Sequence, residues 1–386
     1  MDKKSLLYFA KKRNIVGYTF ALNFPYSNSF IHSFFNLKLG NGILFISMYN
    51  SAVIDLGKIK RNAIAVKRKL PKDVKFCAVV KADAYGHGAE RVSNALMKIA
   101  DCFAVALPEE GVKLRLSGID KDILVLSPCF ESDLEVAIFY NLTLTVQRIK
   151  DLKLIVKEAQ RQNAKVKVHF KYNTGMNRLG FDDLFSLNKA LSYARRSKCI
   201  IIDGLYSHYA NPQDKSSVKT ATDKFLLANK LVKGYNENAV CHISASGGFL
   251  QEKYFDMVRI GILLYGYKPF KTDKIKVFPA MKVFSPVLSR RKVERFDGVL
   301  YGNYKTLTPK TLTLIRFGYA DGLQRRKVKG QANNRCMDIT ALEKNVNGKY
   351  YPIMTDAEIL AKKYGTITYE ILTKITVRAI KIYKNE

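Results

Sequence analysis

Eight short apolar runs follow one another between residues 75 and 266, and this repeat constrains the fold more than any other feature of the chain. The runs are KFCAVV (75–80), CFAVAL (102–107), DILVLS (122–127), LTLTV (142–146), KVKVHF (165–170), CIIIDGL (199–205), AVCHIS (239–244) and MVRIGILLYG (257–266). Continuous apolar runs of this length are typical of parallel strands that are buried on both faces.

The stretches between these runs have helical spacing. In ERVSNALMKIA (90–100), Val92, Leu96 and Ile99 share one helical face. Pro108 opens PEEGVKLRL (108–116), where its fixed φ suits the first turn of a helix. Alternating strands and helices predict an α/β fold with a parallel sheet covered by helices. Eight such units in about 230 residues predict a TIM-like (β/α)8 barrel over residues 48–280.

The pattern changes after about residue 281. The stretches KVFSPVLSRRKVERF (282–296), TLTLIRFGYADGL (311–323) and GTITYEILTKITVRAIKIY (365–383) are strand-like, and only AEILAKKYG (357–365) has a clear helical pattern. We therefore expect residues 281–386 to form a separate, mainly β C-terminal domain.

Residues 1–47 differ from the rest of the chain. They combine a basic start with aromatic, Asn- and Ser-rich stretches such as FPYSNSFIHSFFN (24–36). They contain no continuous apolar core or cleavage site of signal-peptide quality. We expect a poorly structured N-terminal extension, with Met48 as a natural start of the ordered chain.

The charge and cysteine content suggest a cytoplasmic protein with no nucleic-acid or membrane partner. The formal net charge of +32 comes from 65 Lys and Arg against 33 Asp and Glu, but these basic residues are spread along the whole chain and no nucleic-acid motif is present. No segment is long and apolar enough to span a bilayer. The six cysteines form no C-x-x-C pair, which favours free thiols in a reducing compartment, and no metal site is expected.

Candidate functional residues lie where the predicted barrel strands end. They are Lys81, Arg178 in KYNTGMNR, His208 in YSHYAN, Ser246 in SASGG, and Arg259 with Gly261 and Ile262 in MVRIGI. In a barrel these positions converge on one mouth. A desolvated lysine is a good amine nucleophile, and glycine-rich turns suit a phosphate, so the set predicts a Schiff base between Lys81 and pyridoxal phosphate. Each residue taken singly also has a structural explanation, as a solvated strand end or a packing residue.

These motifs make the chain recognisable, because AVVKADAYGHGA (78–89) resembles the cofactor-lysine signature of the alanine racemase family. The resemblance continues, in order, through KYNTGMNRLGF, SHYAN, HISASGG, MVRIGILLYG, VLYGNY, FGYADGLQRR, NRCMD and GTITYEI, and covers about residues 48–386. It implies a pyridoxal phosphate enzyme, an isomerase that interconverts L- and D-alanine and supplies D-alanine for peptidoglycan. It also implies a homodimer in which the partner's β domain completes each active site.

The resemblance assigns roles to individual residues. Lys81 matches the lysine that holds the cofactor and serves as one base, and Tyr301 matches the opposite base, supplied across the dimer interface. Tyr85, Ser246, Gly261, Ile262 and Tyr369 match phosphate-binding positions. Arg259 matches the arginine that faces the pyridine nitrogen. The remaining matches are Arg178, near the cofactor's phenolic oxygen and the substrate carboxylate; Met337, at the substrate carboxylate; His208, between the base tyrosine and the arginine; and Lys171, which is carbamylated in some members.

The chain departs from the family pattern at Ala245, Leu300 and Thr368, and each departure leaves both bases in place. Three alternatives stay open: a racemase of serine or another small amino acid, a fold-related decarboxylase, and a non-catalytic pyridoxal phosphate homeostasis protein. The decarboxylase is disfavoured by the TGMNR and YADG motifs, and the homeostasis protein by the C-terminal domain that carries Tyr301.

Overall fold

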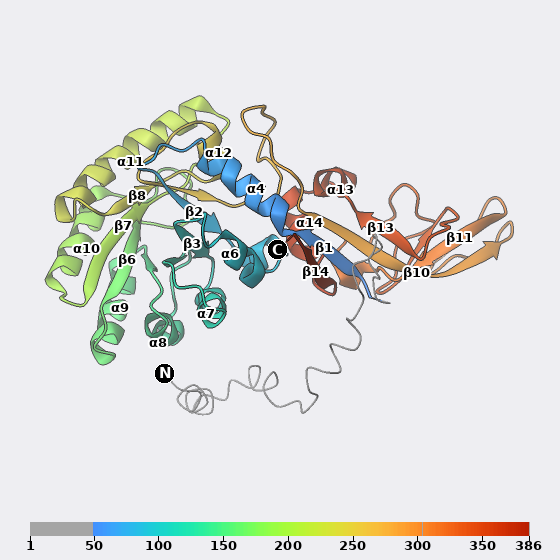
Figure 1. Ribbon diagram of the computed structural model, residues 1–386, viewed down its shortest axis with the longest axis horizontal. Coiled ribbons are helices and arrows are strands. Elements are labelled where there is room, and N and C mark those ends of the chain that lie inside the picture. The colour runs from blue at the N-terminus through green and yellow to red at the C-terminus, as the bar shows by residue number, and fades with distance from the viewer. Residues whose placement is uncertain (1–48, 303, 386) are drawn as a thin grey trace. The chain divides into compact units, whose positions relative to one another are not determined.

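The computed structural model describes residues 49–302 and 304–385 (Figure 1). The expectation for residues 1–47 and the proposed start at Met48 lie outside these described residues.

Eight parallel strands form the barrel. They are β2 (Lys75–Val79), β3 (Cys102–Val105), β4 (Ile123–Val125), β5 (Leu144–Val146), β6 (Val166–Lys171), β7 (Ile200–Tyr206), β8 (Val240–His242) and β9 (Met257–Ile260). They pair in the orders β4-β3-β2-β9 and β5-β6-β7-β8. Parallel bridges between Leu124 and Thr143 and between Ala245 and Arg259 join these two sets into a closed ring. The predicted (β/α)8 barrel is therefore confirmed, and every predicted run contributes one strand.

Helices cover the outside of the barrel (Figure 1). They are α4 (Leu56–Lys67), α6 (Ala89–Leu96), α7 (Pro108–Leu116), α8 (Glu131–Phe139), α9 (Ile149–Arg161), α10 (Leu184–Arg196) and α11 (Lys215–Tyr235), with two short helices at the mouth, α5 (Lys81–Tyr85) and α12 (Ser246–Leu250). Their amphipathic spacing explains their position: α9 buries Leu152, Ile155 and Ala159, one turn apart, against the strands. Pro108 begins α7, as predicted.

The C-terminal part is built on one mixed sheet in the order β12-β11-β10-β1-β14, with β13 also paired to β10. Its strands are β10 (Met281–Val293), β11 (Lys310–Ile315), β12 (Thr340–Leu342), β13 (Tyr350–Met354), β14 (Ile380–Lys384) and β1 (Ser51–Asp55). Strand β1 comes from the far end of the described chain. It lies antiparallel to β10 and parallel to β14, so the two ends of the described part of the chain meet in this sheet.

The strand-like reading of residues 365–383 is wrong for its first half. Residues Thr368–Lys374 form helix α14, which follows α13 (Ala357–Tyr364), and only Ile380–Lys384 is a strand. The helix forms because Ile371 and Ile375 lie one turn apart and are both buried. The strand-like reading of 311–323 also ends early, because β11 stops at Ile315 and Tyr319–Asp321 forms a 3-10 turn.

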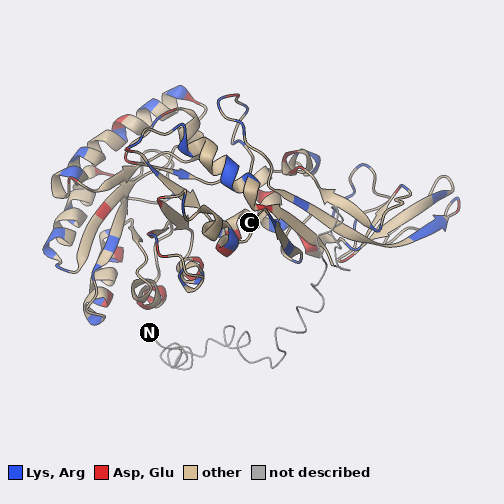
Figure 2. Ribbon diagram, viewed as in Figure 1, with Lys and Arg blue, Asp and Glu red and all other residues tan. Residues whose placement is uncertain are grey.

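Lys and Arg residues are distributed over both the barrel helices and the C-terminal sheet (Figure 2). None of the helices in the described ranges combines the length and the apolar character that a membrane span requires.

Candidate active site

Lys81 lies just beyond the end of strand β2. The strand ends at Val79, so the expectation that Lys81 itself ends the strand is wrong by two residues, and Lys81 begins the short helix α5. Four consecutive non-glycine residues after it, Ala82 to Tyr85, have φ of 52–53°, in the left-handed region. Left-handed backbone costs roughly 1–2 kcal/mol per residue, so the surroundings must hold this turn in place.

Hydrogen bonds from the flanking helices hold the left-handed turn. The Glu110 carboxylate accepts from the backbone N–H of Ala82 at 2.6 Å and of Ala106 at 2.7 Å. The Asp83 carboxylate accepts from the N–H of Ala89 at 2.8 Å and pairs with Lys381 at 2.7 Å. The turn that carries Lys81 is therefore tied to α7, α6 and β14.

Four cationic side chains influence one another at the barrel mouth. Burial lowers the pKa of Lys81, with further contributions from Arg178 and Arg259 that Glu110 opposes. Burial, followed by the charges of Arg178, Arg259 and Lys81, lowers the pKa of Lys171 to about 7. Within residues 49–302 and 304–385, no ion pair neutralises these lysines. Both amines are thus biased toward the neutral, nucleophilic form, and the site as a whole favours an anionic ligand.

Tyr85, Ser246, Gly261 and Tyr369 form one group beside the lysine. The N–H of Gly261 donates to Ser246 Oγ at 3.2 Å, and the rings of Tyr85 and Tyr369 lie 5.9 Å apart. A Cβ atom on Gly261 would lie 2.7 Å from Tyr85 Oη, so the glycine makes room for this hydroxyl. Burial raises the pKa of Tyr369 to about 12 and that of Tyr85 further, so both remain hydroxyl donors suited to a phosphate. Ile262 is buried directly after Gly261.

Arg259 is 3% exposed and occupies the other side of the mouth. Its Nη1 donates to His242 Nδ1 at 2.5 Å, and its Nη2 donates to the Ser207 carbonyl at 2.7 Å and to His208 Nδ1 at 3.2 Å. These contacts use only the two terminal nitrogens, which leaves Nε outside the set. Burial, followed by the charge of Arg259, lowers the pKa of His208 to about 3, so this imidazole is a neutral acceptor. The pKa of Arg259 falls through burial to about 10, which still leaves it charged at neutral pH.

Tyr301 and Met337 lie on loops of the C-terminal part and are largely exposed, by 76% and 54% respectively. Asn333 Nδ2 donates to the Val299 and Tyr301 carbonyls at 2.7 and 2.8 Å, which fixes the loop that carries Tyr301. Among the described residues of a single chain, no hydrogen bond, ion pair or ring contact joins Tyr301 or Met337 to Lys81. The predicted barrel residues therefore come together, whereas these two do not join them within one chain.

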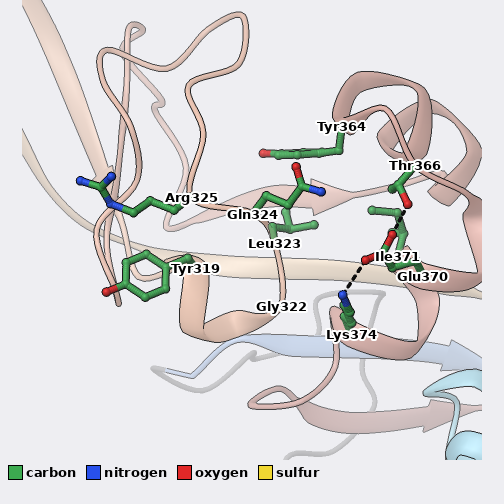
Figure 3. A pocket seen from close by; sticks show the side chains of 10 residues that line it. All are labelled: Tyr319, Gly322, Leu323, Gln324, Arg325, Tyr364, Thr366, Glu370, Ile371 and Lys374. Atoms are coloured by element: carbon green, nitrogen blue, oxygen red, sulfur yellow. Dashed lines mark hydrogen bonds and ion pairs between the residues drawn. The ribbon is translucent and has the colours of Figure 1, made fainter.

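A hollow of about 310 Å3 lies beside Tyr319 (Figure 3). It is lined by Tyr319, Gly322, Leu323, Gln324, Arg325, Tyr364, Thr366, Glu370, Ile371 and Lys374. Figure 3 shows the Lys374–Glu370 ion pair, 2.5 Å long, on one side and Tyr319 and Arg325 on the other. None of the residues predicted to hold the cofactor lines this hollow, so it is distinct from the cluster around Lys81.

Sequence reasoning missed the polar groups inside the barrel strands. Tyr206, His242 and His169 lie in β7, β8 and β6 and are buried next to Arg259 or next to one another. His169 and His242 lie inside the apolar runs KVKVHF and AVCHIS, and Tyr206 directly follows the run CIIIDGL. Their signal was period-2 alternation: in VKVHFK (166–171), His169 and Lys171 are two residues apart and thus face the same way.

Comparison with known proteins extends over the barrel and the C-terminal part. Residues 54–269 match the family model of the alanine racemase N-terminal domain, and residues 280–383 match that of the C-terminal domain. Alanine racemase 1 of Caldanaerobacter subterraneus subsp. tengcongensis is 32% identical over 360 residues, covering 85% of this chain and 93% of the relative. The alanine racemase of Carboxydothermus hydrogenoformans is 33% identical over 368 residues, covering 86% and 98%. The solved alanine racemase of Clostridium difficile 630 has a TM-score of 0.83 at 30% identity, covering 88% of this chain and 96% of that one.

Proposed function

We propose, from the premise that this chain belongs to the alanine racemase family, that it interconverts L- and D-alanine with pyridoxal phosphate as its cofactor. One observation carries the proposal: a half-buried lysine of lowered pKa, Lys81, shares the barrel mouth with a cluster of hydroxyl donors and a buried arginine.

The residues of the mouth fit this cofactor. Tyr85, Tyr369 and Ser246 would donate to its phosphate, together with the backbone at Gly261 and Ile262. Arg259 would face the ring nitrogen through Nε, the one guanidinium nitrogen outside the network described above, while the Lys81 amine would hold the aldehyde carbon. When bound, the cofactor supplies an electron sink that acidifies the Cα–H bond of the amino acid.

Racemisation requires removal of the Cα proton from one face and its return on the other. Lys81 Nζ is proposed as the base on one face, because burial favours its neutral form. Tyr301 Oη is proposed as the acid–base group on the opposite face. His208 would accept hydrogen bonds between the tyrosine and the arginine, since its imidazole is held neutral.

A homodimer explains the position of Tyr301. Its side chain is 76% exposed on a loop fixed by Asn333, so it can reach the barrel mouth of a second copy. Met337 would enter the same mouth and bind the substrate carboxylate with Arg178. Each active site would then combine Lys81 of one subunit with the partner subunit's Tyr301.

Lys171 is proposed to react with carbon dioxide to form a carbamate, with release of a proton. The amine has a pKa of about 7 and no ion-pair partner among the described residues, so it is available for this reaction. The resulting anion would accept hydrogen bonds from Arg178 and hold it near the substrate.

A barrel over residues 48–280 and a β-rich domain over residues 281–386 are proposed, since the last barrel strand is β9 and β10 begins at Met281. Strand β1 is the exception to this division, because it precedes the barrel in sequence but pairs in the C-terminal sheet. A cytoplasmic location is proposed from the six free cysteines.

Chiral chromatography tests the function. The purified chain, loaded with pyridoxal phosphate, should convert L-alanine to a mixture of both enantiomers, and Lys81→Ala should lose this activity and the cofactor absorbance of the Schiff base. Lys69→Ala, which alters a lysine outside the mouth, is the matched control. An active Lys81→Ala variant, or conversion of serine in preference to alanine, would contradict the proposal.

A further inference from the structure

A chain of hydrogen bonds crosses four neighbouring barrel strands and ends at Arg259. Arg259 Nη1 donates to His242 Nδ1 at 2.5 Å, His242 Nε2 lies 2.9 Å from His169 Nδ1, and His169 Nε2 lies 3.0 Å from Asp203 Oδ2. These residues belong to β9, β8, β6 and β7. The two histidines and Arg259 are at most 4% exposed, whereas the Asp203 side chain is 26% exposed.

Donor and acceptor roles in this series of hydrogen bonds follow from its two end groups, Arg259 and Asp203. A guanidinium can only donate, so His242 Nδ1 must carry a lone pair and the ring proton must be on Nε2. That proton points to His169 Nδ1, which must therefore also be bare, and the His169 proton must be on Nε2, directed at Asp203. Both imidazoles are neutral, and all the bonds run from Arg259 toward the carboxylate. Burial, reinforced by Arg259, lowers the pKa of His242 well below its ordinary range, which agrees with this assignment.

The backbone of β7 leaves room for the His169 imidazole. Gly204 follows Asp203 and is paired in register with His169. A Cβ atom at Gly204 would lie 2.5 Å from His169 Cε1 and 2.4 Å from the Val240 carbonyl oxygen. The imidazole can therefore reach Asp203 only because residue 204 has no side chain.

Among residues 49–302 and 304–385, Arg259 has no carboxylate partner. Its hydrogen bonds go to the carbonyls of Ser207, His242 and Ile243 and to the imidazoles of His208 and His242. A carboxylate in direct contact would cancel much of the arginine's field at the mouth, since opposite charges interact strongly at short range in a buried site. Two imidazoles instead lie between the Arg259 guanidinium and the Asp203 carboxylate. The guanidinium therefore keeps its charge and a fixed orientation.

We propose that Asp203 is a positioning residue for the racemisation site: through His169 and His242 it fixes the hydrogen-bond direction that holds Arg259 toward the cofactor ring. The inference rests on the proposed function, in which Arg259 faces the ring nitrogen. Asp203 contacts neither substrate nor cofactor, and it acts only through the two imidazoles.

The variant Asp203→Asn tests this direction. The asparagine amide can donate as well as accept, so the donor direction of every hydrogen bond between residue 203 and His242 can reverse. The reversed direction would place a proton on His242 Nδ1, against the N–H of Arg259. Asp203→Glu keeps an acceptor of the same charge and serves as the conservative rescue. Asp223→Asn is the matched control, because Asp223 pairs with Lys219 at 2.9 Å on α11, and this substitution removes one negative charge without changing a group that contacts the hydrogen-bond chain.

The first readout needs no turnover. In the protein loaded with pyridoxal phosphate and labelled with 15N-histidine, the imidazole 15N shifts report which nitrogen carries the proton. His169 and His242 should both be protonated at Nε2 alone in the wild type, and Asp203→Asn should mix the tautomers while Asp223→Asn does not. A wild-type His242 protonated at Nδ1, or either ring doubly protonated at neutral pH, would overturn the inference without any variant having to fold.

The second readout is kinetic. Asp203→Asn should lower kcat roughly tenfold, the size expected for weakening one hydrogen bond to a charged group, with little change in the KM for alanine. Asp203→Glu should recover most of the loss. An unchanged kcat with unchanged tautomers in Asp203→Asn would contradict the proposal. If the wild type itself fails to racemise alanine, the proposed function fails, but the tautomer measurement still decides the hydrogen-bond direction.

Discussion

Tyr85 and Gly261 are matched in space, because a Cβ atom on residue 261 would lie 2.7 Å from the Tyr85 hydroxyl oxygen. The tyrosine cannot swing away freely, since its ring packs 4.9 Å from Tyr265 and it is only 8% exposed. Gly261→Ala should therefore displace the hydroxyl and weaken binding of pyridoxal phosphate by roughly tenfold, the cost of one lost hydrogen bond to a charged group. Titration of the unloaded protein with the cofactor measures this.

Gly234→Ala is the control for that experiment. Residue 234 lies in helix α11, and a Cβ atom there would meet nothing within 4 Å. Alanine should stabilise this helix by about 0.5–1 kcal/mol and leave cofactor affinity unchanged. Equal affinity in the two variants would contradict the phosphate-binding role of Tyr85.

Mixing subunits tests whether the active site is shared between two chains. Lys81→Ala and Tyr301→Phe should each be inactive alone. After the two are unfolded and refolded together, half of the dimers are mixed, and each mixed dimer has one intact site, so activity should return to about a quarter of wild type. No recovery, with dimers present by light scattering, would place both bases in one chain.

The proposed carbamate at Lys171 should make activity depend on carbon dioxide and pH. Only the neutral amine forms a carbamate, and burial holds its pKa at about 7. Above pH 7 the amine is mostly neutral, so bicarbonate should raise the activity of protein prepared without carbon dioxide. As the pH falls through 7 the amine becomes protonated and this gain should disappear. Lys171→Gln should show no response to bicarbonate, and a wild type equally indifferent would exclude the carbamate.

Arg259→Glu should increase the share of alanine that is transaminated instead of racemised. Arginine keeps its protons, so the ring nitrogen that it faces should stay unprotonated, which weakens the electron sink and shortens the lifetime of the carbanion. A carboxylic side chain could share a proton with that nitrogen, and transamination should increase. Pyruvate formed from alanine, measured with lactate dehydrogenase, is the readout, and an unchanged yield per racemisation event would refute this role.

The barrel was predictable because strands buried on both faces have continuous apolar sequences, as in KFCAVV (75–80). The helix at Thr368–Lys374 was not, because its β-branched residues favour strands locally, and the helix forms where Ile371 and Leu372 pack beside α13 and α5. Strand β1 was equally hidden, since its partners β10 and β14 lie more than 200 residues away in sequence and leave no local signal.

The cluster around Lys81 followed from the convergence of strand ends, together with the family resemblance. The hydrogen-bond chain from Arg259 to Asp203 did not, because His169 lies in a strand that alternates apolar residues with lysines and His242 follows two apolar residues in its strand. Their role depends on which strands are neighbours: β6 and β8 both flank β7, and the two imidazoles lie 2.9 Å apart. The roles of Tyr301 and Met337 stay predictions that the experiments above address.

Isotope exchange tests the two-base account most directly. The loaded protein is incubated with L-alanine in D2O, and both enantiomers are separated and analysed by mass spectrometry at low conversion. Proton removal by one base and return by the other, on the opposite face, predict D-alanine that carries deuterium at Cα from the first turnovers, while the recovered L-alanine gains deuterium more slowly. D-alanine that retains the original proton, or the absence of D-alanine from protein with bound cofactor, would contradict the account.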